Sequence, residues 1–183
     1  MNATSKDFTD ETELLDGCLR QDRKAQKVLY EKYAPRMLTL CTRYVGNKER
    51  AWGILHDGFI TVFDKIGSYN STGSLEGWMR RIFVNTALMS LRKADVLKFT
   101  EELVVVEREV TSEHTALDNI SSKELLRLIA TMPAGFRAVF NMYVIEGYSH
   151  QEIAKEMDIS EGSSRSQLSR ARIWLQERLK ERY

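Results

Sequence analysis

The segment from Gly147 to Leu179 reads GYSHQEIAKEMDISEGSSRSQLSRARIWLQERL, which is typical of a helix, a tight turn and a second helix. Ser149, with Glu152 three residues later, fits a capping box at the start of the first helix. Asp158 suits the left-handed residue of the turn, and Ser160 can cap the second helix, which carries arginines. A helix fits the major groove of B-DNA and contacts base edges through its N-terminal residues, so this arrangement predicts DNA binding.

The rest of the chain also has the periodicity of helices. It contains only 2 Pro and 10 Gly among 183 residues, so long helices can run without interruption. Apolar residues recur every three to four positions in most segments. We expect a first short helix that ends near Arg20, then helices over 24–45, 48–66 and 74–93, with Pro35 kinking or interrupting the first of these three.

The helical pattern then weakens in a charge-rich stretch, and we interpret residues 94–120 as a flexible linker. A second helical domain is expected from Ser121, whose capping box is closed by Glu124, and its next helix from Pro133 to Gly147. The sequence therefore predicts an all-α fold, in which two small helical domains are joined by the linker. The expected domains are residues 10–93 and 121–183.

The formal net charge of +1 is distributed unevenly along the chain. Residues 75–93 carry a net charge of +3, and residues 161–183 also carry +3. Two basic patches separated by a neutral stretch favour two separate DNA contacts over a general coating of DNA. The sequence contains no Gly-rich phosphate loop, no nucleophile elbow and no paired His ligands, so we expect no enzyme, no cofactor and no metal site.

The two cysteines and the N-terminus indicate the compartment. Cys18 and Cys41 lie in segments with helical apolar spacing, which favours reduced thiols in the core of a cytosolic protein. No apolar run reaches the roughly 18 residues that a membrane span requires. The start, MNATSKDFTDETELL, lacks the basic and apolar blocks of a signal peptide. These patterns predict a cytoplasmic protein.

Three stretches of the chain resemble bacterial RNA polymerase sigma factors of the sigma-70 family. AWGILHDGFITVFDKI (residues 51–66) resembles region 2.2, LEGWMRRIFVNTALMSLRK (75–93) resembles regions 2.3 and 2.4, and the C-terminal helix pair resembles region 4.2. Their order and spacing are those of the small, two-domain extracytoplasmic-function type. The resemblance implies a transcription initiation factor that binds core RNA polymerase at the β′ clamp and the β flap, and that recognises the −10 and −35 promoter elements. It also implies an anti-sigma partner, often membrane-anchored, and no small-molecule substrate.

The resemblance assigns the −10 element to the helix at 75–93 and to the loop before it. Ser74 is expected to cap this helix. The residue types suit the task, because Asn can bond a base edge, Arg holds phosphates, and an aromatic ring can stack on a base that has left the duplex. The implied −10 contacts are Tyr69, Asn70, Ser71, Trp78, Arg80, Arg81, Asn85 and Arg92.

By the same resemblance, the second helix of the C-terminal pair contacts the −35 element. Leu168 and Trp174 are expected to pack this helix, and Arg172 is assigned to the phosphate backbone. The implied −35 contacts are Ser163, Ser164, Arg165, Ser166, Gln167, Ser169, Arg170 and Arg172. The polar face of the helix at 48–66 is implied to bind the coiled coil of the polymerase β′ subunit. The implied polymerase contacts are Gly53, His56, Asp57 and Ile60.

The chain departs from the family pattern at several positions, including Trp52 and Ser90. Gly53 stands where an acidic residue is common, and His56 stands where Gln is usual. Met89 occupies a position that is often acidic, and Ser164 one that is usually apolar and faces the first helix of the pair. Two alternatives therefore stay open, namely a sigma-like mimic that sequesters an anti-sigma factor and a free-standing helix-turn-helix regulator.

Overall fold

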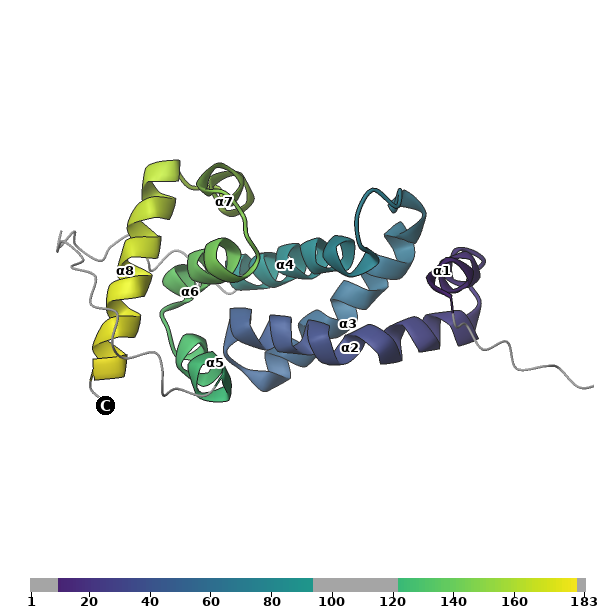
Figure 1. Cartoon of the computed structure of the whole chain (residues 1–183), viewed down its shortest axis with the longest axis horizontal. Coiled ribbons are helices and arrows are strands. Elements are labelled where there is room, and N and C mark those ends of the chain that lie inside the picture. Colours follow the sequence, from purple (N-terminus) through teal and green to yellow (C-terminus); the bar gives the residue numbers. More distant parts are fainter. Residues whose placement is uncertain (1–9, 94–121, 181–183) are drawn as a thin grey trace, which may run out of the picture.

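The computed structural model describes residues 10–93 and 122–180, and all regular structure within these ranges is helical (Figure 1). We refer to the first range as the N-terminal half and to the second as the C-terminal half. The predicted all-α fold is confirmed, while the expected linker at 94–120 and the cap at Ser121 lie outside the described residues. The N-terminal half contains α1 (Glu11–Leu19), α2 (Arg23–Val45), α3 (Lys48–Lys65), the 3-10 turn η1 (Ile66–Ser68) and α4 (Leu75–Lys93).

Helix α2 continues as one element through Pro35, so of the two expected effects, a kink or an interruption, the interruption is wrong. Proline removes one N–H from the hydrogen-bond ladder of a helix. Here Tyr33 and Met37 are buried on either side of it, and their packing holds this stretch of α2 against the core. The Thr39 hydroxyl donates a hydrogen bond of 2.9 Å to the Pro35 carbonyl. Tertiary packing therefore outweighs the local preference for a break.

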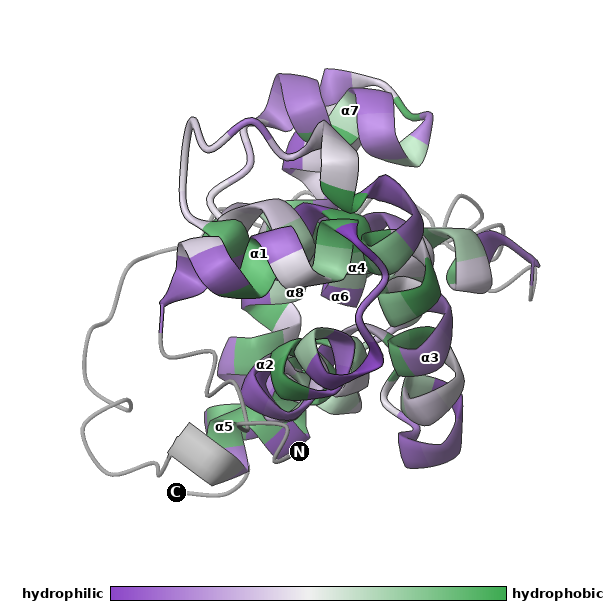
Figure 2. Cartoon of the chain, turned by 90° about the vertical axis from the view of Figure 1, so that its right-hand side faces the viewer, coloured by the Kyte–Doolittle hydropathy of each residue, from purple (hydrophilic) through white to green (hydrophobic). Residues whose placement is uncertain are grey.

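Helices α2, α3 and α4 pack around a shared hydrophobic core. Phe83 of α4 is fully buried, and its ring meets the Phe59 ring edge-on with 5.2 Å between centroids. Gly58 of α3 lies directly against Phe83, because a Cβ placed on this glycine would come within 2.2 Å of the ring. Helices α3 and α4 thus approach closely at a point where α3 has no side chain. Figure 2 shows hydrophobic residues gathered where these helices meet and hydrophilic residues on their outer faces.

The C-terminal half departs from the sequence prediction in one helix. A single helix from Pro133 to Gly147 is expected, but the structure has a short α-helix followed by a π-helical turn. In that turn hydrogen bonds span five residues, as between the Glu146 N–H and the Asn141 carbonyl at 2.9 Å. Gly147 ends the segment with φ of +78°. The elements are α5 (Ser122–Ala130), α6 (Ala134–Phe140), the π-turn η3 (Asn141–Ile145), α7 (His150–Met157) and α8 (Glu161–Lys180).

The two halves touch each other at the end of α2, which contacts both α5 and α6. In Figure 1 the C-terminal half lies at one end of the N-terminal bundle, and α1 lies at the other end. Arg137 of α6 donates from Nε to the Tyr44 carbonyl at 2.8 Å, and Asn141 donates from Nδ2 to the Arg43 carbonyl at 3.2 Å. The last carbonyls of a helix have no partner within it. The C-terminal half therefore caps α2.

Candidate nucleic-acid interface

Helices α7 and α8 form the predicted helix-turn-helix. Ser149 Oγ accepts the Glu152 N–H at 3.2 Å, and the Glu152 carboxylate accepts the Ser149 N–H at 2.8 Å, which confirms the capping box. The Ser149 N–H and the Ser149 hydroxyl both donate to this carboxylate, and these two hydrogen bonds lower the pKa of Glu152. Asp158 has φ of +56° at the turn, and Ser160 Oγ accepts the Ser163 N–H at 3.0 Å at the start of α8. Local sequence signals thus specify both helix starts and the turn.

One face of α8 turns toward α7 and contains two residues that the resemblance assigns to the −35 element. Ser164 is fully buried, and its Oγ lies 2.9 Å from His150 Nδ1 of α7. Gln167 is 8% exposed and precedes the buried Leu168. Both side chains are buried and lie away from the outer surface of α8, which argues against a direct −35 contact by either.

The outer face of α8 carries the other six implied −35 residues. Arg165 forms an ion pair of 2.9 Å with Glu161, one turn earlier on the same helix. An exposed pair of this kind contributes only about 0.3–0.5 kcal/mol, so a DNA phosphate can replace the carboxylate. Among the six, the exposed residues are Ser163, Arg165, Ser166 and Arg172, and the half-exposed ones are Ser169 and Arg170.

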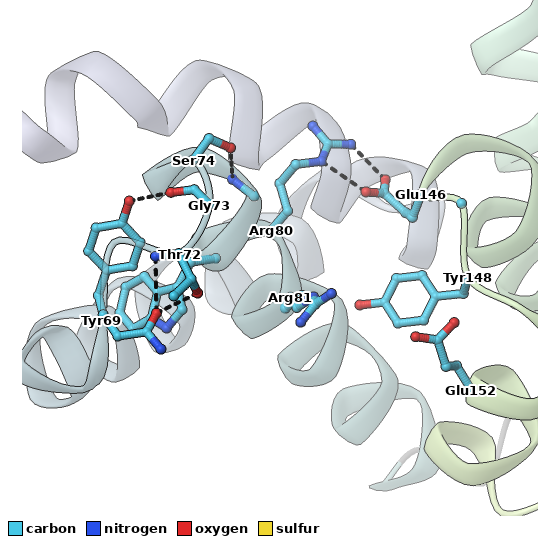
Figure 3. A pocket seen from close by; sticks show the side chains of 13 residues that line it. Tyr69, Thr72, Gly73, Ser74, Arg80, Arg81, Glu146, Tyr148 and Glu152 are labelled. Carbon is cyan, nitrogen blue, oxygen red and sulfur yellow. Dashed lines mark hydrogen bonds and ion pairs between the residues drawn. The ribbon is translucent and has the colours of Figure 1, made fainter.

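The loop before α4 is shaped by its own hydrogen bonds (Figure 3). The Tyr69 hydroxyl donates to the Gly73 carbonyl at 2.5 Å, and the Tyr69 and Trp78 rings lie 5.6 Å apart between centroids. Asn70 Oδ1 accepts hydrogen bonds from the Thr72 N–H at 3.2 Å and from the Thr72 hydroxyl at 2.7 Å. A tilted pair of aromatic rings beside exposed polar groups suits the stacking of a nucleic-acid base.

The start of α4 carries further implied −10 residues. Ser74 caps the helix as predicted, since its Oγ accepts the Gly77 N–H at 3.1 Å. Ser71 is exposed in the preceding loop and has φ of +58°. Arg81 and Asn85 are both exposed, and residues four positions apart share one face of a helix. These side chains are therefore accessible on α4 and its loop.

A cavity of about 510 Å³ lies between this loop, α4 and the segment that leads into α7 (Figure 3). The C-terminal half contributes Glu146, Tyr148 and Glu152 to its lining. In Figure 3, Arg81 points toward Tyr148 and Glu152, and burial raises the pKa of the Tyr148 hydroxyl. The C-terminal half thus faces the proposed base-binding surface. The implied −10 residues in the lining are Tyr69, Asn70, Trp78, Arg80 and Arg81.

Two of the implied −10 arginines are engaged by the C-terminal half. Arg80 donates from Nε and Nη2 to the Glu146 carboxylate at 2.9 and 2.7 Å. Arg92 donates to the backbone carbonyl of Glu156. Sequence reasoning missed Glu146, because its partners Arg80 and Arg43 lie 66 and 103 residues away along the chain. No local pattern could have indicated this contact.

The outward face of α3 carries all four implied polymerase-binding residues. On this face Trp52 is 40% exposed and Ile60 is 60% exposed. Large apolar side chains on an exposed helix face suit a protein–protein interface. A Cβ added to Gly53 would meet no atom within 4 Å, so packing does not require glycine there. The exposed residues are Gly53, His56, Asp57 and Ile60.

Three further findings concern residues 10–93 and 122–180. No group of three or more His, Cys, Asp or Glu side chains in these ranges is placed to hold a metal ion. None of the described helices is both long and apolar enough to cross a membrane. Cys18 and Cys41 are free and buried, and burial raises their pKa to about 11 and about 12. Both therefore belong to the core.

Comparison with known proteins identifies both halves. The family model Sigma-70 region 2 matches residues 29–96, and Sigma-70, region 4 matches residues 122–175. The ECF RNA polymerase sigma-E factor of Haemophilus influenzae is 26% identical, with 96% of this chain and 97% of the relative covered. Its namesake in Escherichia coli (strain K12) is 27% identical, with 92% and 93% covered. A crystal structure of the sigma factor RpoE with the anti-sigma factor NepR from Bartonella quintana shares the fold, with a TM-score of 0.54 at 18% identity, covering 84% of this chain and 96% of that one.

The helix-turn-helix, with the match of its residues to region 4, defines a DNA-binding protein of the transcription machinery. The chain belongs to the sigma-70 family of RNA polymerase sigma factors, in its extracytoplasmic-function branch. It is therefore a transcription initiation factor and not an enzyme. As a sigma factor, it has core RNA polymerase and promoter DNA as its partners.

Proposed function

We propose that the chain divides its task between two domains. Residues 10–93 bind core polymerase and recognise and melt the −10 element, residues 94–120 connect, and residues 121–183 recognise the −35 element. The observation that carries this division is the order of two basic surfaces, on α4 and on α8, within the matched regions 2 and 4. Melting is then driven by tighter binding to the opened strand than to the duplex.

The −35 element meets the outer face of α8 in this proposal. The N-terminal part of the helix reads base edges, and Arg172 holds the backbone. The contact set is Ser163, Arg165, Ser166, Ser169, Arg170 and Arg172.

The −10 element meets the loop before α4 and the exposed side of that helix. The Tyr69 and Trp78 rings take an unstacked base, while the amides of Asn70 and Asn85 are suited to base edges. The contact set is Tyr69, Asn70, Ser71, Trp78, Arg80, Arg81, Asn85 and Arg92. Opening the duplex costs about a few kcal/mol per unstacked step, which stacking on these rings offsets.

Polymerase docking is proposed on the outward face of α3 for the β′ clamp, with the C-terminal domain on the β flap. Gly53, His56, Asp57 and Ile60 form the α3 contact. An anti-sigma factor that covers these surfaces, anchored to a membrane or not, is a further proposed partner, since the Bartonella quintana relative was crystallised with one. The proposed location is the cytoplasm, where the polymerase works.

In-vitro transcription tests the proposed function directly. Purified core polymerase and this chain are incubated with genomic fragments from the source organism. Start sites that are absent with core alone are expected, and they reveal both promoter elements. Binding to core without transcripts would favour a sigma-like mimic, and no binding to core would favour a free-standing regulator.

Two variants test which surface contacts the −35 element and which contacts core polymerase. Arg165→Ala combined with Arg170→Ala should abolish −35-dependent transcription and leave core binding intact, whereas Lys180→Ala, which removes a charge at the far end of α8, should transcribe normally. Asp57→Arg should weaken holoenzyme assembly, whereas the same reversal at the exposed Glu31 of α2 should not. Unchanged promoter output from the double variant would remove α8 from the −35 contact.

A further inference from the structure

One carboxylate lies at the start of α8, beside the residues proposed to contact the −35 element. Glu161 is the first residue of α8, and its Oε2 accepts a hydrogen bond from Arg165 Nη2 at 2.9 Å. The side chain of Glu161 is 44% exposed and that of Arg165 is 62% exposed. An acidic side chain repels the phosphates of DNA, so Glu161 does not add general affinity for DNA.

The direction in which Glu161 points follows from the register of α8. Residues separated by three or four positions lie on one side of a helix, which places Arg165, Ser169 and Arg172 in one row with Glu161. The three other members of this row belong to the proposed −35 contact set. The inward side of the helix is fixed by the fully buried Ser164, which packs against α7. Because a recognition helix contacts base edges through its N-terminal residues, Glu161 lies where base edges come within reach.

A carboxylate in the major groove discriminates between bases, because an ionised carboxylate only accepts hydrogen bonds. Cytosine presents an amino group and no acceptor in this groove, so it suits a carboxylate. Guanine presents two acceptors, and thymine presents an acceptor and a methyl group, so neither offers a hydrogen bond to Glu161. Adenine has an amino group, but its N7 acceptor lies beside it, and this pair of groups is better matched by an amide. Of the four bases, cytosine therefore fits Glu161 best.

The ion pair makes the DNA contact of Arg165 depend on Glu161. An exposed pair of this kind contributes little to stability, so Arg165 can leave Glu161 for a phosphate or a guanine. Glu161 then loses the hydrogen bond from Arg165 while DNA displaces water around it. A cytosine amino group replaces that hydrogen bond, whereas guanine or thymine leaves the charge desolvated and unpaired, which is costly. A site with the wrong base therefore weakens two contacts, because Arg165 is held back to neutralise Glu161.

We propose that Glu161 is a specificity-determining residue of the −35 contact, and that it selects cytosine at one base position by rejecting the other three bases. The inference rests on the proposed function of α8, and it names the base that one position of the −35 element presents to this helix. Specificity of this kind comes from an unfavourable contact with the wrong partner as well as from a favourable contact with the right one. The rejection requires the negative charge, so a neutral side chain of the same size changes the preference.

Glu161→Gln in the full chain tests this, because Gln keeps the size, removes the charge and replaces a pure acceptor by an amide that pairs with adenine. Glu177→Gln is the matched control, with the same change of charge at an exposed position near the other end of α8. Each protein is assembled with core polymerase and given a pool of promoters in which the −35 element is randomised. Every promoter carries its own barcode downstream of the start site, so sequencing of the transcripts measures the preference for each base at each −35 position.

With the wild type, cytosine should be favoured at one −35 position, and each other base there should lower transcription by about 5- to 150-fold, the usual effect of one mismatched base pair. Glu161→Gln should replace this preference by one for adenine and leave the remaining positions unchanged. Glu161→Ala, whose side chain cannot hydrogen-bond to any base, should lose the cytosine preference without gaining one for adenine. Glu177→Gln should reproduce the wild-type preferences throughout. Far-ultraviolet circular dichroism checks that all three variants keep the helical signal.

The outcomes separate this inference from the proposed function. Specific wild-type transcripts whose base preferences are unchanged in Glu161→Gln would overturn the inference and leave the initiation role intact. A uniform rise in transcription from all promoters would also overturn it, because net charge alone would then account for the effect of Glu161. A changed preference at every −35 position would show that Glu161 acts through the placement of α8, which equally refutes a contact with one base. If the wild type directs no specific transcripts, the proposed function fails, and this inference fails with it.

Discussion

Two glycines in α3 allow the close packing of α3 on α4 to be measured. Gly53 and Gly58 both lie inside the same helix, and alanine at either position removes the conformational cost of glycine, about 0.5–1 kcal/mol. A Cβ at Gly53 meets open space, whereas a Cβ at Gly58 would lie 2.2 to 2.8 Å from three atoms of the Phe83 ring. Phe83 is fully buried and braced by Phe59, so its ring has little room to move.

The magnitudes predict that only one of the two substitutions raises the stability of the protein. Gly53→Ala should raise the free energy of unfolding by about 0.5–1 kcal/mol. Gly58→Ala also removes the conformational cost of glycine, but its Cβ overpacks the site beside the Phe83 ring, which costs about 1–3 kcal/mol. Both variants gain the same stabilisation from replacing glycine, so the difference between them is the cost of overpacking alone. Gly58→Ala should therefore be less stable than Gly53→Ala by about 1–3 kcal/mol.

Urea unfolding followed by circular dichroism measures both variants and the wild type. The unfolding midpoint should rise for Gly53→Ala and fall well below it for Gly58→Ala, with similar slopes m. If Gly58→Ala is as stable as Gly53→Ala, the Phe83 ring does not pack on α3 as described, and the α3–α4 approach is wrong.

Two further predictions concern a cap and the buried thiols. Ser149→Ala should lower the stability of the C-terminal half by about 0.5–2 kcal/mol, as removal of an N-cap usually does. The pKa of Glu152 in the folded protein lies below its ordinary value of 4.5. The ionised carboxylate therefore contributes to folding stability above that pH, and this contribution is lost as the pH falls through the folded pKa. Thermal unfolding in acid should therefore depend less on pH in Ser149→Ala, and an unchanged pH profile would contradict the role of the capping box. Cys18 and Cys41, with pKa values raised to about 11 and about 12, should resist Ellman's reagent at pH 8 until denaturant is added. Rapid reaction of either thiol in the native protein would show that it is not in the core.

Local sequence signals predicted the helix-turn-helix down to single hydrogen bonds. Ser149, Asp158 and Ser160 take the roles expected of them, because a cap or a left-handed turn depends on a few neighbouring residues. The helical periodicity likewise predicted the three long N-terminal helices to within a residue or two. The function was predicted from the family resemblance, which rests on three stretches of sequence in a fixed order.

Contacts between distant parts of the chain could not be predicted in this way. Whether Pro35 breaks α2 depended on how deeply the neighbouring side chains Tyr33 and Met37 are buried in the core. The resemblance places Ser164 among the −35 contacts and also at a position that faces the first helix of the pair, and the packing against His150 decides for the inward position. The engagement of Arg80 by Glu146 depends on residues far apart in sequence, which no periodicity records.

By itself the sequence determined which segments are helical, where the helices begin, and which segments carry the two basic surfaces, because these depend on caps, propensity and local charge. Only the tertiary structure decided which side chains of those surfaces are free. That choice follows from how the end of α2 meets α6, where unpaired carbonyls and buried arginines must find partners from the other half of the chain.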